Sequence, residues 1–298
     1  MADIDREHLS GLYGLSFAAA DLIVPGVNRT YRLRHEDHAY YLRLYREAGR
    51  SRQQIAAELS LLERFPRQTK VDVSRPVPTR AGATLLELPF DNRQRLACLF
   101  QDIGNVEIEI TRDGIRKFGE ALAWLHTSIP ATVDGPVRTI DPVTIGEDAL
   151  QAIKQIAGSA SVSRAIEQQY LPAIEASTYG ALPQGLCHGD AWTGNARIFE
   201  GKIGFFDFDD FGQGAFMLDV GTAAWHLRAQ GAQSYLLTDA LISGYEAVRA
   251  VSEKERETLP LFIQLAELRS LIFLAENCLL SEETWLVVFR RAEEMLRS

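Results

Sequence analysis

The segment that decides the fold is Gly185-Leu-Cys-His-Gly-Asp-Ala-Trp-Thr-Gly-Asn195, followed by Ala196-Arg-Ile-Phe-Glu-Gly-Lys-Ile-Gly-Phe-Phe-Asp207-Phe-Asp-Asp210. The residues on either side of Gly201-Lys202 are strand-like, and this pair suits a Gly-first two-residue hairpin loop of type II′. Counting back from that loop places Ala196 opposite Asp207. Facing residues of a hairpin have Cβ atoms roughly 4.5–5.5 Å apart, so we expect Asn195 and Asp207 to meet at its open end.

These residues supply oxygen ligands. Asp190 lies upstream of Asn195 on a loop that contains glycine, so two carboxylates and an amide oxygen converge. Hard oxygen donors suit Mg²⁺, which takes one or two carboxylates and leaves its other positions to water and phosphates. The segment therefore predicts a metal site formed by Asn195 and Asp207, with Asp190 beside it. The alternative is a surface loop in which Asp and Asn only form turns.

The spacing His188-Gly-Asp190-(x)4-Asn195 also matches the protein-kinase catalytic loop, in which the Asp accepts the proton of a substrate hydroxyl and the Asn binds metal. A second metal-binding Asp follows later in those loops, as Asp207 does here. Because phosphoryl transfer depends on positioning and charge neutralisation, we expect Asp190 to orient and deprotonate an attacking hydroxyl. His188 is expected to be a buried, hydrogen-bonded support for the loop.

These motifs resemble the signature of the aminoglycoside-phosphotransferase-like kinases, a superfamily that includes choline kinases, type II homoserine kinases and bacterial stress-response kinases. The Asp-Phe-Asp-Asp form of residues 207–210 and the helix expected over 265–276 are most similar to the homoserine-kinase-like and stress-response branches. The resemblance spans about Gly26 to Glu276. It implies an α+β, bilobal protein-kinase-like fold, with ATP and Mg²⁺ as cofactors and a small-molecule hydroxyl acceptor.

The resemblance also assigns a nucleotide loop. Gly26, Asn28 and Thr30 match its pattern of Gly, Asn and Ser/Thr between the first two strands. A glycine beside small polar residues lets backbone N–H groups approach phosphates, although an ordinary turn would have the same composition. Phe100 and Asp102 fall where the hinge between the lobes would contact adenine.

One position departs from the family pattern. Arg43 stands where the family usually has a lysine that reaches the α- and β-phosphates, and Glu58 matches the acidic partner of that cation. Arginine keeps the charge, but its planar fork is bulkier than an ammonium group. We expect Arg43 to contact the nucleotide; the alternative is a surface ion pair.

Periodicity divides the chain into lobes at residues 1–103 and 104–298. The first lobe has strand pairs at 30–35 with 39–45 and at 84–88 with 95–100, the second pair around Asp91-Asn92. A capping box, Ser51 with Gln54, opens a helix that ends near Arg64. After Gly104 the apolar period is near 3.6, which predicts helices at about 113–127, 144–157, 162–177, 215–230, 233–250, 256–279 and 282–297.

Composition excludes several classes of protein. The 298 residues include 31 Lys+Arg and 40 Asp+Glu, a formal charge of −9 that argues against a nucleic-acid partner. Three scattered cysteines predict neither a disulfide framework nor a zinc ribbon. The polar N-terminus does not resemble a secretory signal, and charges interrupt the most apolar stretch, so we expect a cytoplasmic protein without a membrane partner.

The sequence thus favours an ATP- and Mg²⁺-dependent phosphotransferase acting on an alcohol. A nucleotide-binding pseudokinase and a Ser/Thr protein kinase of the stress-response type are the alternatives. Asp209 and Asp210 are candidate acceptor residues, and with Glu267 they would attract an amine; the alternative for Asp210 and Glu267 is a solvated surface charge. Asp219 is expected to be a structural helix cap. The sequence does not define the acceptor, the choice between ATP and GTP, or the oligomeric state.

Overall fold

Both predicted strand pairs are present in the computed structural model, which describes residues 4–47, 49–228 and 234–297. They belong to one antiparallel sheet of order β1-β2-β3-β6-β5. Its strands are β1 (Ala19–Val24), β2 (Arg29–His35), β3 (His38–Leu44), β5 (Leu86–Phe90) and β6 (Arg93–Gln101). Asp91 and Asn92 connect β5 to β6 with positive φ angles of 50° and 61°, the backbone of a type I′ hairpin turn.

The sheet packs on a hydrophobic core that the periodicity did not fully predict. Helix α1 (Arg6–Tyr13) and strand β1 were not expected, because each is short and its apolar residues fit no long repeat. The core contains Leu9, Tyr13, Phe17, Tyr31, Leu33, Leu42, Leu44, Leu88, Phe90, Ala97 and Leu99. Helix α2 (Arg52–Arg64) follows the sheet, and its predicted capping box between Ser51 and Gln54 is formed in both directions.

A second, three-stranded sheet joins distant parts of the chain. Strand β4 (Val71–Val73) pairs in parallel with β9 (Lys202–Phe205), which lies beside β8 (Ala196–Phe199). The predicted β8–β9 hairpin is present, but its loop is Glu200-Gly201 and not Gly201-Lys202. Both loop residues have positive φ, 48° and 76°, which makes the turn type I′. The predicted loop was wrong by one residue because Glu200, a non-glycine residue, adopts the left-handed region. The expected pairing of Ala196 with Asp207 is also wrong, because β9 ends at Phe205.

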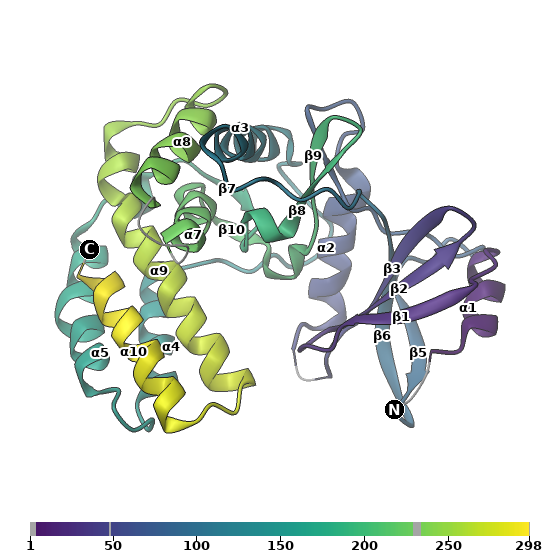
Figure 1. The fold of residues 1–298 in the computed structure, drawn as a ribbon, viewed down its shortest axis with the longest axis horizontal. Helices are drawn as coiled ribbons and strands as arrows, with labels where there is room; N and C mark the ends of the chain where they lie inside the picture. The colour runs from purple at the N-terminus through teal and green to yellow at the C-terminus, as the bar shows by residue number, and fades with distance from the viewer. Residues whose placement is uncertain (1–3, 48, 229–233, 298) are drawn as a thin grey trace. The chain divides into compact units, whose positions relative to one another are not determined.

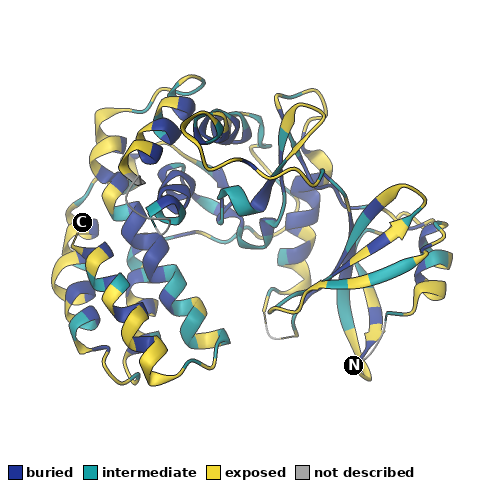
Figure 2. Cartoon of the chain, viewed as in Figure 1, coloured by how far each residue is buried: buried dark blue, intermediate teal, exposed yellow. Residues whose placement is uncertain are grey.

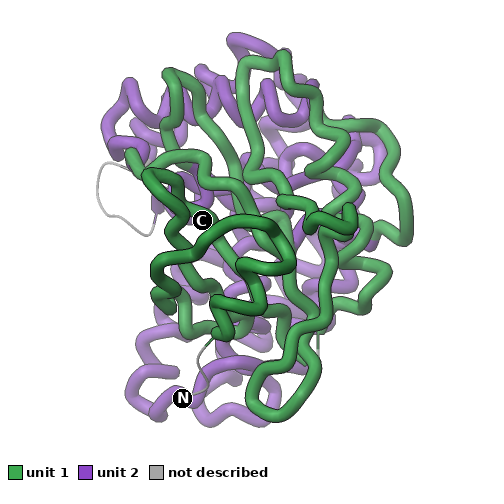
Figure 3. The backbone as a smooth tube through the Cα atoms, turned by 90° about the vertical axis from the view of Figure 1, so that its right-hand side faces the viewer, with its two compact units in different colours: residues 1–106, 129–137, 197–209 green, residues 107–128, 138–196, 210–298 purple. Residues whose placement is uncertain are grey.

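The chain forms two compact units (Figure 3). Unit 1 comprises Met1–Val106, Ile129–Val137 and Arg197–Asp209; unit 2 comprises Glu107–Ser128, Arg138–Ala196 and Asp210–Ser298. The boundary expected after residue 103 lies near the end of the first stretch. The two later stretches of unit 1 were not part of that expectation: β4 holds one through β9, and α2 holds the other through the Arg64–Asp134 ion pair.

Unit 2 is mostly helical, so the predicted division into a β-rich N-terminal part and a larger helical part is confirmed (Figure 1). Its longer helices are α3 (Arg112–Ser128), α4 (Pro142–Ile153), α7 (Met217–Arg228), α8 (Ser234–Glu246), α9 (Glu253–Asn277) and α10 (Glu282–Leu296). A two-stranded sheet pairs β7 (Gln184–Cys187) with β10 (Gly212–Ala215). The helix predicted over 162–177 is divided into α5 (Ala160–Ala165), a π-helical turn (Ile166–Tyr170) and α6 (Leu171–Ala176). Pro172, which has no backbone N–H, follows that turn.

Helix α9 is the centre of unit 2. Its length and composition would allow it to cross a membrane, and among the described helices it alone passes that test. It packs against α7 and α4, however, and its buried residues run from Glu255 to Leu271 (Figure 2). Its buried Glu267 accepts hydrogen bonds from Trp225 Nε1 at 2.7 Å and from Arg291 at 2.8 Å. Charged side chains are buried inside proteins almost only when they are paired, so paired Glu267 is typical of a helix in the protein core.

Two glycines allow α3 and α8 to pack closely. A Cβ atom at Gly119 of α3 would overlap the carbonyl oxygen of Leu241, and one at Gly244 of α8 would overlap that of Arg116. Both obstructions are helical backbone, which cannot rotate away as a side chain can. The periodic pattern showed the apolar faces of these helices but not their separation.

We therefore predict that Gly244→Ala lowers the free energy of unfolding by about 1–3 kcal/mol, because overpacking forces the helices apart. Gly11→Ala is the matched control: Gly11 is exposed on α1 with no other atom near its Cβ position. That variant should gain roughly 0.5–1 kcal/mol from helix propensity. Chemical denaturation measures both, and a Gly244→Ala protein as stable as the wild type would contradict the close-packing account.

Candidate active site

The loop that follows β7 carries the first part of the site. Gly189 has φ of +89°, and a Cβ atom there would overlap the carbonyl oxygen of Asp210. The glycine is therefore needed both for its left-handed backbone and for the close approach of residue 210. Asp190 follows directly, so its position depends on this turn.

A buried carboxylate holds the same loop. Asp219, on α7, accepts the backbone N–H groups of His188 at 2.7 Å and Gly189 at 2.8 Å. It also contacts Nε2 of His126 at 2.9 Å, and Nδ1 of that histidine lies 2.7 Å from the hydroxyl of Tyr245. Burial alone would raise the pKa of Asp219, but its hydrogen bonds and the nearby histidines hold that pKa below its usual value. Asp219 is structural as expected, but it anchors the loop rather than capping a helix.

His188 has the supporting role that was predicted. Its side chain is fully buried, and its Nδ1 accepts the backbone N–H of Asp190 at 3.2 Å. The histidine thus fixes the peptide of Asp190 and presents no ring nitrogen to solvent.

The structure brings Asp190 and Asn195 together. Asn195 is buried in a short 3₁₀ turn, Thr193–Asn195. Its Nδ2 donates to Asp190 Oδ2 at 2.8 Å and to the carbonyl oxygen of Asp190 at 2.9 Å. The amide is therefore oriented by its nitrogen, which leaves its oxygen, the atom that binds metals, on the other branch of the group.

In unit 1, Arg43 lies between two carboxylates. Its NH2 contacts Asp207 Oδ1 at 2.8 Å, and its NH1 contacts Glu58 Oε1 at 3.4 Å. The guanidinium is also 5.4 Å from the centre of the Phe100 ring. Only 10% of the Arg43 side chain is exposed, so the surface ion pair considered for it is excluded. Burial raises the pKa of Glu58 to about 8, although Arg43 opposes that rise.

The remaining nucleotide-loop candidates lie between β1 and β2 or at the start of β2. Asn28 Nδ2 donates to Asp209 Oδ2 at 3.2 Å, and Asn28 Oδ1 accepts the backbone N–H of Arg46 at 3.0 Å. Thr30 pairs directly with Arg43 across β2 and β3. Gly26 lies in the bend before β2, without a positive φ that would require glycine. Asn28 therefore lies against Asp209 and Thr30 lies opposite Arg43, while Gly26 is near Asn28 in the chain.

Asp102 makes contacts of a different kind. It follows β6, and its Oδ1 accepts the backbone N–H of Gly104 at 3.1 Å. It also lies close enough to Tyr41 to help raise the pKa of that phenol, after burial. Phe100 pairs with Tyr41 across β3 and β6. These contacts fix the end of β6, where the contact with adenine was expected.

Two of the three carboxylates expected to attract an amine, Asp210 and Glu267, are already paired with arginines. Asp210 contacts Arg138 at 2.9 Å and Arg269 at 3.2 Å. Glu267 is fully buried with Arg291 and Trp225. Buried Glu267 is not the solvated surface charge that was the alternative, whereas the Asp210 side chain is 40% exposed. Because both are paired with arginines, neither adds an unbalanced negative charge. The sequence could not show this, because the arginines lie far along the chain from their partners.

Two groups of side chains have the chemistry of metal ligands. In unit 1, the carboxylates Glu58, Asp207 and Asp209 lie around the Arg43 guanidinium, and Asp209 Oδ1 is buried without a hydrogen-bond partner among the described residues. This surplus of oxygen ligands fits a hard divalent cation. In unit 2, ligand atoms of His126, Cys187 and Asp219 also lie close together. There the carboxylate oxygens already accept other hydrogen bonds, and burial raises the pKa of the Cys187 thiol, so the unit 2 group is a hydrogen-bonded network.

Several contributors were not predicted. His126 and Tyr245 looked like ordinary helix residues, and Arg138 and Arg269 like surface charges, because no short motif contains them. Trp192 stacks on His226 with ring centres 4.1 Å apart and planes 8° apart. The Trp192 indole follows Asp190 closely in sequence, which was the one available signal for that pair.

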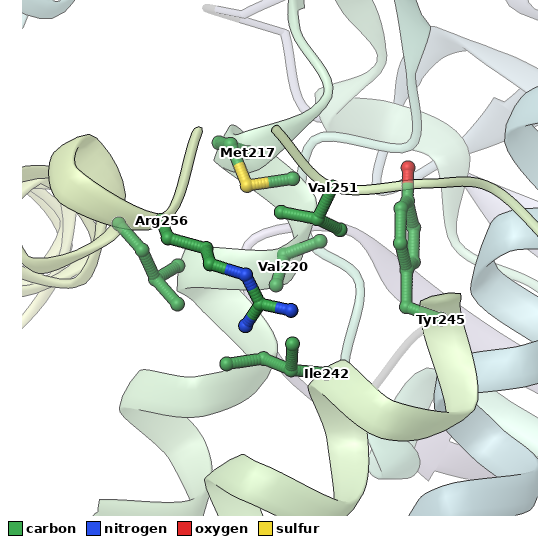
Figure 4. A pocket seen from close by; sticks show the side chains of 7 residues that line it. Met217, Val220, Ile242, Tyr245, Val251 and Arg256 are labelled. Atoms are coloured by element: carbon green, nitrogen blue, oxygen red, sulfur yellow. The ribbon is translucent and has the colours of Figure 1, made fainter. Parts of the chain in front are cut away.

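A small cavity in unit 2 is lined in part by the ring of Tyr245 (Figure 4). Its walls are mostly aliphatic and include Met217, Val220 and Ile242. Tyr245 turns its hydroxyl to His126, so the cavity receives the apolar part of the ring. It is a packing defect beside the Asp219 network and has no chemistry of its own.

Comparison with known sequences gives the chain a family. The phosphotransferase enzyme family matches residues 26–251. A homoserine kinase of Xanthobacter autotrophicus is 29% identical over 265 residues, which are 84% of this chain and 78% of that protein. An uncharacterized protein of Deinococcus radiodurans is 27% identical over 266 residues, or 86% of this chain and 76% of that protein.

Solved structures share the fold. A microcompartment-associated aminopropanol kinase superimposes with a TM-score of 0.78 at 22% identity, covering 98% of this chain and 94% of the other. An amicoumacin kinase in complex with AMP-PNP, Ca²⁺ and Ami superimposes with a TM-score of 0.80 at 17% identity, covering 97% and 92%. The resemblance inferred from the motifs is confirmed. Because the family match spans most of the chain, this protein belongs to the phosphotransferase enzyme family.

Proposed function

We propose that this protein transfers the γ-phosphate of ATP, with Mg²⁺, to the hydroxyl group of a small amine-bearing molecule. The observation that carries the proposal is the Asp190–Asn195 pair, joined at 2.8 Å on a loop that Asp219 holds from inside. The family match supports phosphotransfer as the type of reaction. Similar proteins named for homoserine and aminopropanol support a small alcohol as the acceptor.

In this reaction Asp190 is the general base. Its carboxylate accepts the proton of the acceptor hydroxyl as that oxygen bonds to the γ-phosphorus, and the bond to the bridging oxygen breaks to release ADP. Asn195 donates to Asp190 Oδ2 and so orients the carboxylate of the proposed base. A positioned base of this kind contributes roughly 10²- to 10⁴-fold to the rate.

The residues proposed to hold Mg²⁺ are Asn195, through its amide oxygen, and Asp207. When bound, the metal supplies positive charge to the nucleotide phosphates. Arg43 already contacts Asp207 Oδ1 at 2.8 Å, so it orients that carboxylate. We propose that Gly26, Asn28 and Thr30 border the phosphates, that Arg43 with Glu58 also faces them, and that Phe100 and Asp102 border the adenine.

The proposal that the acceptor carries an amine is supported more by the similar proteins than by the charges of this chain. Asp210 and Glu267 are balanced by arginines, which removes two of the carboxylates that favoured a cation. Asp209 has a buried oxygen that makes no hydrogen bond to any described residue, and it remains a candidate for contact with an amine. The homoserine and aminopropanol of the similar proteins' names both carry amines.

One observation favours a nucleotide-binding protein without transferase activity. The ion pair between Arg43 and Asp207 occupies two residues that a kinase needs for the nucleotide and the metal. Against it, a pseudokinase has no need of Asp190, Asn195 and Asp207 together. A Ser/Thr protein kinase would use the same three residues, so a screen should include a generic protein substrate.

A matched pair of acceptors tests the amine. We expect turnover of a small amino alcohol to exceed that of its N-acetylated form by at least about tenfold, a difference of about 1.4 kcal/mol. Coupled detection of ADP measures both rates. Equal rates would reject the cationic acceptor while leaving phosphotransfer intact.

Asp207→Ala should abolish the part of nucleotide binding that depends on Mg²⁺. Its carboxylate is the proposed metal ligand, and calorimetry with ATP in the presence and absence of Mg²⁺ measures the difference. Asp134→Ala is the control, because it removes an exposed carboxylate from the same unit. If Mg²⁺ strengthens ATP binding equally in the Asp207→Ala and wild-type proteins, Asp207 does not hold the metal.

A further inference from the structure

The carbonyl group that precedes Asp190 has a charged donor that the kinase motif does not include. Arg269, on α9, donates from NH1 to the carbonyl oxygen of Gly189 and contacts Asp210 Oδ2 with NH2 at 3.2 Å. Only 19% of its side chain is exposed. A largely buried guanidinium that donates to a loop carbonyl requires a structural or functional reason.

That carbonyl belongs to the peptide that enters Asp190. Peptide groups are planar, so the orientation of the Gly189 C=O bond fixes the orientation of the Asp190 N–H bond. The Asp190 N–H in turn donates to Nδ1 of His188 at 3.2 Å. One peptide group is therefore held at both ends, by Arg269 at its oxygen and by His188 at its nitrogen. The preceding peptide is held by Asp219, which accepts the Gly189 N–H.

The hydrogen bond from Arg269 to the Gly189 carbonyl is needed because glycine bears that carbonyl. Glycine has the widest conformational freedom of any residue, and Gly189 is in the left-handed region at φ of +89°. Asp219 fixes the nitrogen side of Gly189, but it does not contact the carbonyl that leads to Asp190. Without Arg269, rotation about ψ of Gly189 would move the Asp190 carboxylate relative to its acceptor.

The carboxylate of Asp210 orients the Arg269 side chain. This carboxylate contacts Arg269 through Oδ2 and Arg138 through Oδ1, while Arg138 Nε donates to the carbonyl oxygen of Phe211 at 3.0 Å. The two arginines bind the same carboxylate, but they donate to different backbone carbonyls: Arg269 to that of Gly189, and Arg138 to those of Phe211 and Asp210. Arginine suits this task because its planar fork can bind the carbonyl and the carboxylate at once.

We propose that Arg269 is a positioning residue for the reaction: it fixes the Gly189–Asp190 peptide and so aims the Asp190 carboxylate, with Asp210 orienting Arg269. This inference rests on the proposed function only for the identity of Asp190 as the base. It assigns Asp210 to the support of the loop in place of the acceptor contact expected from the sequence.

The test compares Arg269→Gln and Arg138→Gln with the wild type and with Arg290→Gln, an exposed arginine of α10. A hydrogen bond from a charged donor is lost in Arg269→Gln, so we expect kcat to fall about 10- to 100-fold. The KM for ATP should stay within about threefold, because the nucleotide residues are unchanged. Arg269→Lys should recover part of the loss, and Arg138→Gln should cost clearly less than Arg269→Gln.

Hydrogen exchange at the Asp190 amide is the second measurement, and it needs no acceptor. Arg269→Gln should accelerate this exchange at least about tenfold while the melting temperature stays close to that of Arg290→Gln. If kcat and amide exchange are both unchanged in Arg269→Gln, the inference is wrong. Equal losses in Arg138→Gln and Arg269→Gln would also overturn it, because general disruption around Asp210 would then explain both. Absence of turnover in the wild type rejects the proposed function instead, and the exchange result still decides the role of Arg269.

Discussion

The structure of the proposed catalytic loop depends on one buried charge, the carboxylate of Asp219. It is fully buried, yet it remains ionised because two backbone N–H groups and a histidine ring surround it. An unpaired carboxylate in that position would cost several kcal/mol, so the loop, α7 and His126 must come together in one arrangement. Tyr245 completes the network from α8 and leaves His126 a single orientation. Each further feature of the loop, from the left-handed Gly189 to the Asp190–Asn195 contact, is built on this anchor.

In unit 1 the central buried charge is a cation, Arg43, with carboxylates around it. There one guanidinium, Arg43, is shared by Glu58 and Asp207, and the carboxylate of Asp209 lies nearby. Lysine would present a single point of charge at this position, whereas the arginine fork reaches both partners from one strand. Three carboxylates thus lie around Arg43, and one oxygen of Asp209 has no hydrogen-bond partner in the described part of the chain. The ring of carboxylates around Arg43 in unit 1 thus differs from the Asp219 network of unit 2, where a histidine and two backbone N–H groups surround one carboxylate.

The sequence predicted local features well and remote partners poorly. Helix positions, the Ser51 capping box and the β8–β9 hairpin followed from spacing and turn chemistry, because the groups involved are neighbours in the chain. The hairpin loop was misplaced by one residue, since Glu200 adopts a backbone that favours glycine. The spacing of Asp190 and Asn195 was informative for the same local reason. The contacts of Asp219 with His126 and of Asp210 with Arg138 and Arg269 join residues far apart in sequence, and no motif records them.

The central claim is that Asp190 acts on the acceptor hydroxyl as a base and is not needed to bind nucleotide. Asp190→Asn tests it most directly, because asparagine keeps the size of the side chain and an oxygen that can accept the Asn195 bond. Transfer to an accepted alcohol and ATP affinity should be measured on the same preparation. The account predicts that transfer falls by roughly 10²- to 10⁴-fold while ATP affinity stays within a few-fold. Turnover equal to that of the wild type would contradict it.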